Sequence, residues 1–251
     1  MRMIRNILMR ITTSFDRPDK GTVCDKKEQI KMSKNIRAVI FDLDGTLTDT
    51  EKFYQIAWPK ALAHFGYECE PWMPLEMRSL GRPFAPVKFK EWFGEDFDYH
   101  TVREYRRGLV ADIIKEQGIP LKPGAVEILT WLRERGILTC IATANEYERT
   151  KGYLTKLGLF DHFDRIICAD MVKQGKPAPD IYAYACKELG LSPEETFAVE
   201  DSPNGVTSAY EAGCNVIMVP DLTQPDEELS KKLYACVPSL LDIKGLLAPI
   251  S

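Results

Sequence analysis

Short apolar runs alternate with longer amphipathic segments along the second half of the chain. The apolar runs predict strands at residues 36–41, 137–142, 165–168, 196–200 and 216–219. The amphipathic segments between the later runs predict helices at residues 125–135, 146–157, 180–189 and 203–212, each followed by a glycine. This spacing is typical of βαβ units. We therefore predict an α/β fold, a Rossmann-like parallel sheet with helices on both faces.

The first strand ends in an acidic turn. The run from Ile36 to Phe41 is almost wholly β-branched, aromatic or aliphatic, which is typical of a parallel strand covered on both faces. Asp42 and Asp44 follow it, and Gly45 breaks the strand. Carboxylates at this end of a parallel strand lie where open α/β sheets bind ligands. A solvated turn, in which Asp only favours the bend, is the alternative.

Residues 51–119 interrupt the alternation with helical patterns and no convincing strand. The predicted helices are 51–65, 74–80, 86–93 and 99–117. Pro59 lies within the apolar face of the first and predicts a kink or a later start. We therefore predict a helical cap domain at 51–119, inserted into a core domain made of 36–50 and 120–251. An insertion directly after the acidic turn is placed to close over it as a lid.

The first 35 residues differ in composition from the rest. Residues 1–37 contain ten Lys or Arg and four Asp or Glu, although the whole chain has a net charge of −4. We expect a basic, disordered leader at 1–35 that stays outside the core. An organellar presequence and a translation start upstream of Met32 are alternatives that the residues leave open.

The overall composition is that of a soluble globular protein. The chain is 45% hydrophobic and 28% charged, and its net charge attracts neither nucleic acid nor an anionic membrane. No apolar run approaches the ~20 residues that a membrane span needs. Seven scattered cysteines without a Cys-x-x-Cys pair predict buried reduced thiols and a cytoplasmic location. We expect a monomer or a weak homodimer.

Two further loops offer groups that suit an anion. The second predicted strand runs into Thr143, Ala144 and Asn145, which present a hydroxyl and free backbone N–H groups near a helix N-terminus. An ordinary helix cap is the alternative there. Lys176 precedes Pro177 and Pro179, which fix the backbone just before another helix; a solvated surface charge is the alternative there.

Acidic residues also end the fourth predicted strand. Glu200 and Asp201 follow an apolar run directly, which is costly unless a cation or hydrogen bonds compensate their charge. Carboxylates without a supporting His or Cys suit a hard, octahedral cation that keeps waters, and we therefore predict Mg²⁺ at this sheet edge. The cation and Lys176 would offset the charge of a phosphoryl group beside Asp42 and Asp44.

Four strings stand at these strand ends in a fixed order. They are Phe41-Asp42-Leu43-Asp44-Gly45-Thr46-Leu47-Thr48-Asp49-Thr50, Thr143, Gly175-Lys176-Pro177-Ala178-Pro179-Asp180 and Val199-Glu200-Asp201-Ser202-Pro203-Asn204-Gly205. With them the chain resembles the haloacid dehalogenase superfamily, in the branch with a helical cap after the first strand, alongside β-phosphoglucomutase-like phosphatases. The resemblance covers residues 36–245, and all four strings at matching elements are a specific signal.

The resemblance implies a role for each matching residue. Asp42 would be the nucleophile that forms an aspartyl-phosphate, and Asp44 the general acid and then the base. Thr143 and Lys176 would bind the phosphoryl oxygens, with Lys176 also restraining Asp42.

The resemblance also implies a set of metal ligands. Asp42, the backbone carbonyl of Asp44 and Asp201 would hold Mg²⁺, with Glu200 in support. For this chemistry the pKa of Asp42 must stay low, kept so by Mg²⁺ and Lys176, whereas Asp44 needs a raised pKa.

Among the reactions of this superfamily, the resemblance favours those of phosphate esters. Dehalogenase and phosphonatase members lack an acid two residues after the nucleophile, and Asp44 is that acid here. We predict a phosphatase acting on a small phosphorylated metabolite. A phosphosugar mutase is the alternative, although Tyr54 stands where β-phosphoglucomutases carry a His. An inactive binding or regulatory protein of the same fold is a third reading, which the retained acids and Lys176 oppose.

Specificity contacts are expected from the predicted cap. The candidates are Arg82, Lys88, Phe53, Tyr54 and Trp58, although the aromatic ones fit a cap core equally well. The sequence names neither the substrate nor the oligomeric state.

Overall fold

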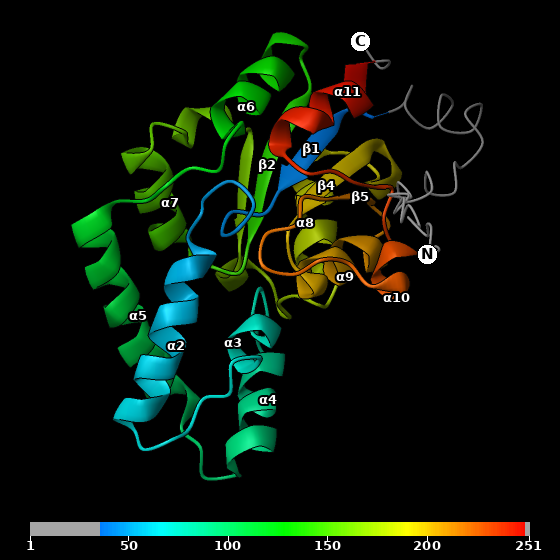
Figure 1. The fold of residues 1–251 in the computed structure, drawn as a ribbon. Coiled ribbons are helices and arrows are strands. Elements are labelled where there is room, and N and C mark those ends of the chain that lie inside the picture. Colours follow the sequence, from blue (N-terminus) through cyan, green and yellow to red (C-terminus); the bar gives the residue numbers. More distant parts are fainter. Residues whose placement is uncertain (1–35, 249–251) are drawn as a thin grey trace, which may run out of the picture.

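A six-stranded sheet lies at the centre of the larger lobe (Figure 1), in a computed structural model that describes residues 36–248. The predicted leader, residues 1–35, lies outside the described residues. The strands are β1 (Ala38–Phe41), β2 (Leu138–Thr143), β3 (Arg165–Cys168), β4 (Thr196–Glu200), β5 (Asn215–Met218) and β6 (Ala235–Cys236). Their order is β3-β2-β1-β4-β5-β6, and every pair is parallel. The predicted parallel sheet is confirmed.

The register brings three strand ends together. Phe41 of β1 lies opposite Ile141 of β2 and Val199 of β4. Successive strands add on opposite sides of β1, so β1 is a switch point of the kind at which α/β sheets bind ligands. The residues that follow these three positions therefore meet at one edge.

Helices cover both faces of the sheet. One face packs against α6 (Ala125–Glu134), α7 (Tyr147–Lys156) and α11 (Ile243–Leu247), and the other against α8 (Asp180–Leu189), α9 (Pro203–Glu211) and α10 (Glu227–Ser230). Side chains of β1 alternate between the two cores, with Val39 and Phe41 in the first and Ile40 in the second. Burial on both faces explains the nearly unbroken apolar run of this strand.

The helices of residues 51–119 form a second lobe with its own apolar cluster (Figure 1). They are α2 (Glu51–His64), α3 (Met73–Glu76), α4 (Phe84–Phe93) and α5 (Tyr99–Gln117). The predicted later start of the first helix is wrong, because α2 begins at Glu51 and continues through Pro59. The second helix is shorter than predicted and gives way to a turn in which Ser79 has φ 56. We call this part the helical lobe and propose it as the cap.

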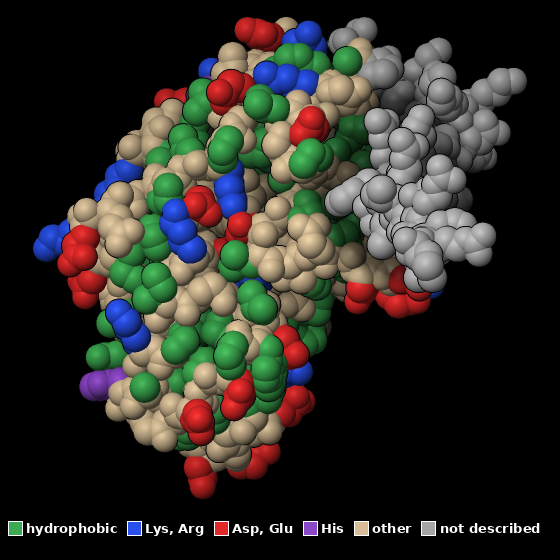
Figure 2. Space-filling view, in the orientation of Figure 1, with side chains coloured by type: hydrophobic (Ala, Val, Ile, Leu, Met, Phe, Trp, Pro, Cys, Tyr) green, Lys and Arg blue, Asp and Glu red, His purple; other side chains and the backbone are tan. Residues whose placement is uncertain are grey.

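The expected absence of a nucleic-acid or membrane partner stays a prediction. On the face shown in Figure 2, basic and acidic side chains are interspersed and form no continuous basic patch. None of the described helices is long and apolar enough to cross a membrane.

The cysteines only partly match the expected buried thiols. Cys140, Cys168, Cys186 and Cys214 are buried, whereas Cys69 is partly exposed and Cys236 is exposed. The latter two lie outside the cores on which the prediction was based, so for them it is wrong. The described cysteines are free thiols.

Two glycines let the lobes approach closely. The amide of Gly81 donates to the carbonyl of Lys176 at 2.8 Å, and that of Gly175 donates to the carbonyl of Arg82 at 2.7 Å. A Cβ at Gly81 would lie 2.7 Å from the Gly175 Cα, nearer than real Cβ contacts allow. This backbone pairing joins the helical lobe to the loop that carries Lys176.

We expect Gly81→Ala to lower the free energy of unfolding by about 1–3 kcal/mol, because the new methyl group meets backbone that cannot move aside. Urea denaturation measures the change. Gly245→Ala is the matched control, since a Cβ there meets nothing within 4 Å and its helix should gain up to about 1 kcal/mol. Equal stability of the two variants would contradict the close approach of the loops.

Candidate active site

Asp42 lies directly after β1 and is buried beneath the helical lobe. Its amide donates to the carbonyl of Val199 at 3.0 Å, which holds the residue in line with the sheet. Its Oδ1 accepts a hydrogen bond from Lys176 Nζ at 2.6 Å. Its Oδ2 is buried and has no hydrogen-bond partner among the described residues. One oxygen is thus held, while the other is available to an atom that the chain does not supply.

Lys176 bridges two carboxylates at the centre of the site. Its Nζ donates to Glu200 Oε1 at 2.5 Å as well as to Asp42, and the side chain is fully buried. Tyr182 also donates to Glu200 Oε1, at 2.7 Å. Although burial alone would lower the pKa of Lys176, the Asp42 and Glu200 carboxylates raise it. The alternative of a solvated surface lysine is wrong.

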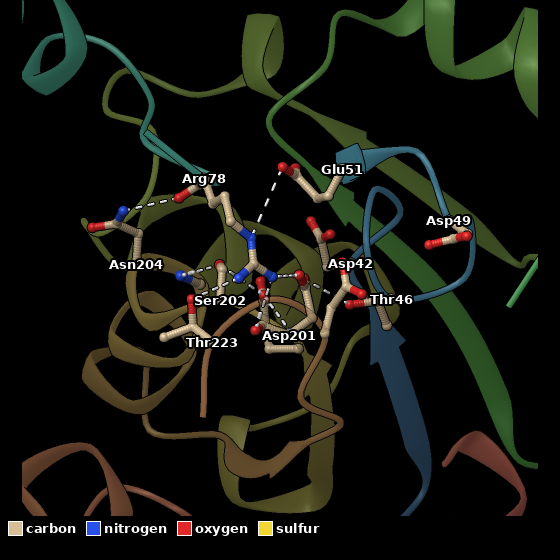
Figure 3. A network of polar contacts seen from close by, with 12 residues as sticks. Asp42, Thr46, Asp49, Glu51, Arg78, Asp201, Ser202, Asn204 and Thr223 are labelled. Carbon is tan, nitrogen blue, oxygen red and sulfur yellow. Dashed lines mark hydrogen bonds and ion pairs between the residues drawn. The ribbon is translucent and has the colours of Figure 1, made fainter. Parts of the chain in front are cut away.

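Asp201 is paired with an arginine of the helical lobe (Figure 3). Arg78 Nη2 forms an ion pair with Asp201 Oδ2 and donates to the Asp201 carbonyl at 3.1 Å. Arg78 Nη1 donates to Thr223 Oγ1 at 2.9 Å, and its Nε lies 3.9 Å from Glu51 Oε2. Both Arg78 and Glu51 are buried. This network joins the helical lobe to the acids of the sheet edge.

Gly45 leaves room for Asp201. Its φ is +88°, and a Cβ built there would lie 2.2 Å from Asp201 Oδ2. Only glycine accepts both the positive φ and this contact. The neighbouring Thr46 donates from Oγ1 to Asp201 Oδ1 at 3.1 Å, so the acidic turn and the end of β4 support each other.

The buried charges at this edge do not balance. Four buried carboxylates face two buried cations in the described part of the chain; the acids are Asp42, Glu51, Glu200 and Asp201, and the cations Lys176 and Arg78. If all six groups are ionised, two negative charges remain uncompensated. Burial without full compensation is costly, so the cluster must either take up protons or hold a cation.

The pKa values follow this imbalance. Burial raises the pKa of Asp42, against the opposing effect of Lys176, and raises that of Glu51 against Arg78. Burial likewise raises the pKa of Asp201 to about 6, against Arg78. The expectation that Lys176 helps to keep the pKa of Asp42 low is thus right in direction but insufficient, because burial outweighs the lysine.

A divalent cation fits this site. Ligand oxygens of Asp42, Glu200 and Asp201 lie within 4.8 Å of one another. A double positive charge would cancel the excess, and the unpartnered Asp42 Oδ2 would gain a ligand. An all-oxygen donor set suits Mg²⁺ rather than a softer metal.

Within the described residues, the side chain of Asp44 accepts hydrogen bonds only from neutral side chains. Thr50 Oγ1 donates to its Oδ1 at 2.5 Å, and Tyr54 OH approaches the same oxygen at 3.5 Å. Asn145 Nδ2 donates to its Oδ2 at 2.5 Å. The carboxylate is partly exposed and lines the cavity between the lobes.

The loop after β2 departs from the prediction in one respect. Thr143 and Ala144 line the cavity as expected, and Thr143 is buried. The amide of Asn145, expected to be free, donates to Thr143 Oγ1 at 3.2 Å, and its side chain binds Asp44. Because β2 runs into a turn before α7, the threonine hydroxyl captures this amide, as Thr commonly does in local turns. Asn145 therefore orients Asp44.

Three of the five cap candidates line the cavity, which has a volume of about 100 Å³. Arg82, Tyr54 and Trp58 face it. Phe53 does not, because it is buried in the cluster of the helical lobe, and Lys88 instead pairs with Glu76 at 3.1 Å. Amphipathic spacing cannot separate these roles, since both sides of α2 are covered.

The sequence reading missed Arg78, Glu51 and Tyr182. Glu51 stands directly after the acidic turn, which is a usable signal. No sequence signal points to Arg78, because its partner Asp201 lies 123 residues away in the chain. The positive φ of Ser79 beside it marks an unusual turn, but only the structure reveals it.

Comparisons with known proteins agree with this geometry. A family model of the haloacid dehalogenase-like hydrolases matches residues 36–213, which include the helical lobe and most of the sheet. The chain is 34% identical over 223 residues to (DL)-glycerol-3-phosphatase 1, mitochondrial, of Arabidopsis thaliana, covering 84% of this chain and 72% of that protein. It is 30% identical over 221 residues to the phosphorylated carbohydrates phosphatase of Thermotoga maritima, covering 84% and 90%.

Solved structures share the whole architecture. The crystal structure of CbbY from Rhodobacter sphaeroides in complex with phosphate has a TM-score of 0.72 and 26% identity, and the match covers 85% of this chain and 99% of that one. A β-phosphoglucomutase from Clostridium difficile has a TM-score of 0.71 at 24% identity, covering 85% and 97%, and shares the fold.

We expect Arg78→Met to lower the free energy of unfolding by about 3–5 kcal/mol without added metal, because it leaves buried carboxylates without a counter-ion. Chemical denaturation measures the loss. Arg165→Met is the control, since Arg165 is exposed and such changes stay within about 0.5 kcal/mol. A similar effect of both substitutions would show that the Arg78 ion pairs contribute no stability.

Proposed function

Because the chain belongs to the haloacid dehalogenase-like hydrolases, we propose that it is a Mg²⁺-dependent phosphatase that forms an aspartyl-phosphate. The chain is a phosphoric monoester hydrolase, as its relatives named above are. The proposed parts are the metal, the covalent intermediate, the role of each residue and a small phosphorylated metabolite as substrate.

One observation carries the proposal. Asp42 offers an unpartnered buried oxygen within a cluster whose other acidic atoms are already held by Lys176, Tyr182, Thr46 and Arg78. A buried carboxylate oxygen without a partner is costly, and proteins retain such groups where a ligand or a reaction uses them. Asp42 and Asp44 both line one cavity, so a nucleophile and a proton carrier serve the same space.

In the first half-reaction Asp42 attacks phosphorus. A carboxylate oxygen of Asp42 forms a bond to phosphorus while the bond from phosphorus to the ester oxygen breaks. The leaving oxygen takes a proton from Asp44, whose hydrogen-bond partners Thr50 and Asn145 aim it. Lys176 holds Asp42 in place. Thr143 lines the cavity and would bind the phosphoryl oxygens together with Lys176.

In the second half-reaction water displaces Asp42 from phosphorus. Asp44, now ionised, accepts a proton from water as the water oxygen bonds to phosphorus. The bond from phosphorus to Asp42 breaks, which restores the Asp42 carboxylate and releases inorganic phosphate. Closure of the helical lobe over the cavity excludes bulk water until this step.

The metal would be held by Asp42, Asp201 and the backbone carbonyl of Asp44, with Glu200 in support. Mg²⁺ bound there supplies positive charge that lowers the repulsion between the acids and a phosphoryl dianion. It would also reverse the burial effect that raises the pKa of Asp42, so that this nucleophile is ionised near neutral pH.

We expect phosphate release from 4-nitrophenyl phosphate to require Mg²⁺ and to stop in EDTA. Mg²⁺ at 100 times its Kd should also stabilise the fold by about 2.7 kcal/mol, which a thermal-shift measurement detects without substrate. The same assay with β-glucose 1-phosphate tests the mutase alternative. Conversion to glucose 6-phosphate with little free phosphate would overturn the phosphatase proposal.

Two substitutions should separate the two half-reactions. Asp42→Asn should lower kcat by about 10³-fold or more, because no covalent intermediate forms. Asp44→Asn should still release one equivalent of 4-nitrophenol in a burst, since this leaving group needs no proton. Its steady-state rate should fall by about 10²–10⁴-fold. Stopped-flow absorbance measures both phases, and loss of the burst in Asp44→Asn would contradict the assigned roles.

A further inference from the structure

The cavity has a second end that is rich in arginine. Arg82, Arg103, Arg106 and Arg149 line it there, and Glu146 is the acid beside them. Glu146 is already engaged, because Arg103 and Arg107 both donate to it at 3.2–3.4 Å. This end therefore carries positive charge that the surrounding described side chains do not neutralise.

Arg106 is the residue that most needs a partner. It is 8% exposed, and no ion pair in the described part of the chain includes it. Its Nε is buried without a hydrogen-bond partner among the described residues. The guanidinium lies over the rings of Tyr54 and Trp58, at 4.9 and 4.6 Å from their centroids. Stacking supports the cation but leaves its donors unused.

Arg149 approaches the same place from α7. It donates to Tyr54 OH at 2.9 Å and to Tyr153 OH at 2.6 and 2.9 Å. These phenol groups are neutral, because burial raises the pKa of Tyr54 and of Tyr153 and outweighs the opposing effect of the Arg149 charge. Two arginines, from α5 and α7, thus share Tyr54 and face one cavity, and no carboxylate of residues 36–248 forms an ion pair with either.

We infer that this end of the cavity binds a second anionic group of the substrate, a carboxylate or a phosphate, on Arg106 and Arg149. The planar guanidinium fork matches both anions, and a charge-assisted hydrogen bond is worth more when the donors are desolvated. The inference rests on the proposed function and names the substrate class: a phosphate monoester whose alcohol part is itself an anion.

Tyr54 sets the distance between the two ends. Its hydroxyl lies 3.5 Å from Asp44 Oδ1 and 2.9 Å from Arg149 Nη2. Two hydrogen bonds through Tyr54 thus join Asp44, which protonates the leaving oxygen in the proposed reaction, to Arg149, which would bind the second anion, so a short substrate can reach both residues. Asp44, Arg106 and Arg149 also line the same cavity. A short phosphorylated hydroxy acid or a short bisphosphate meets both conditions.

The first experiment compares matched substrates with the Mg²⁺-loaded protein. One pair is phosphoglycolate and its uncharged amide, and the other is propane-1,3-diol bisphosphate and the monophosphate. We expect kcat/KM to be about 10–100-fold higher for the anionic member of at least one pair, as hydrogen bonds to charged groups predict. Whichever pair shows the preference identifies the anion. Equal kcat/KM within both pairs would overturn the inference.

Substitutions then assign the preference to residues. Arg106→Met and Arg149→Met should each reduce the ratio of kcat/KM within the preferred pair at least fivefold, and Arg106→Lys should restore part of it. Arg165→Met, on the exposed edge strand, should leave the ratio unchanged. An unchanged ratio in both Met variants would mean that the two arginines only pack against Tyr54 and Trp58.

A binding measurement separates this inference from the proposed function. Calorimetry with glycolate, or with 3-hydroxypropylphosphonate, tests the arginine end without any turnover, because neither molecule has a phosphate ester bond. Weaker binding in Arg106→Met than in Arg165→Met supports the second anion site even if no ester is hydrolysed. Suppose instead that the esters without a second anionic group are hydrolysed and that the two variants bind the ligand equally well. This result would support the phosphatase and overturn the second site.

Discussion

The site depends on Lys176, a buried ammonium group held between Asp42 and Glu200. Without this cation, two fully buried carboxylates at adjacent strand ends would repel each other at close range. With it, one oxygen of Asp42 is fixed and the other remains open. The position of the lysine depends in turn on the backbone hydrogen bonds of Gly81 and Gly175. The loop that carries Lys176 is therefore also the loop that contacts the helical lobe.

Arg78 compensates buried negative charge in the same way, but from the other lobe. A residue of the helical lobe compensates Asp201, an acid of the sheet, so the arrangement of the lobes and the charge of the proposed metal ligands are coupled. Even so, the acids outnumber the buried cations, which is why a divalent cation fits. The arginine end of the cavity shows the opposite imbalance. A substrate with one anionic group at the metal-binding end and another at the arginine end would compensate the positive charge of both the bound cation and the arginines.

Local patterns predicted most of the fold. The helix at 99–117 and the strand at 165–168 have the predicted bounds, because the capping Asp98, the closing Gly118 and a short apolar run act within a few residues. The length of the second helix of the helical lobe was overestimated. The helix ends early because the chain turns at Ser79 and brings Gly81 against the core. The short strand β6 and helix α11 at the C-terminus went unassigned because their patterns are too short to distinguish.

The sequence by itself determined the parallel sheet, the residues at its carboxyl edge and, through their order, the family. Those features depend on periodicity and on neighbours in the chain. Only the tertiary structure decided which groups compensate which charges. Arg78 meets Asp201, Asn145 turns to Asp44, and Arg106 has no acidic partner among the described residues, because segments distant in sequence pack together. Burial then converts those placements into the energies that matter, since charge is costly only where water is excluded.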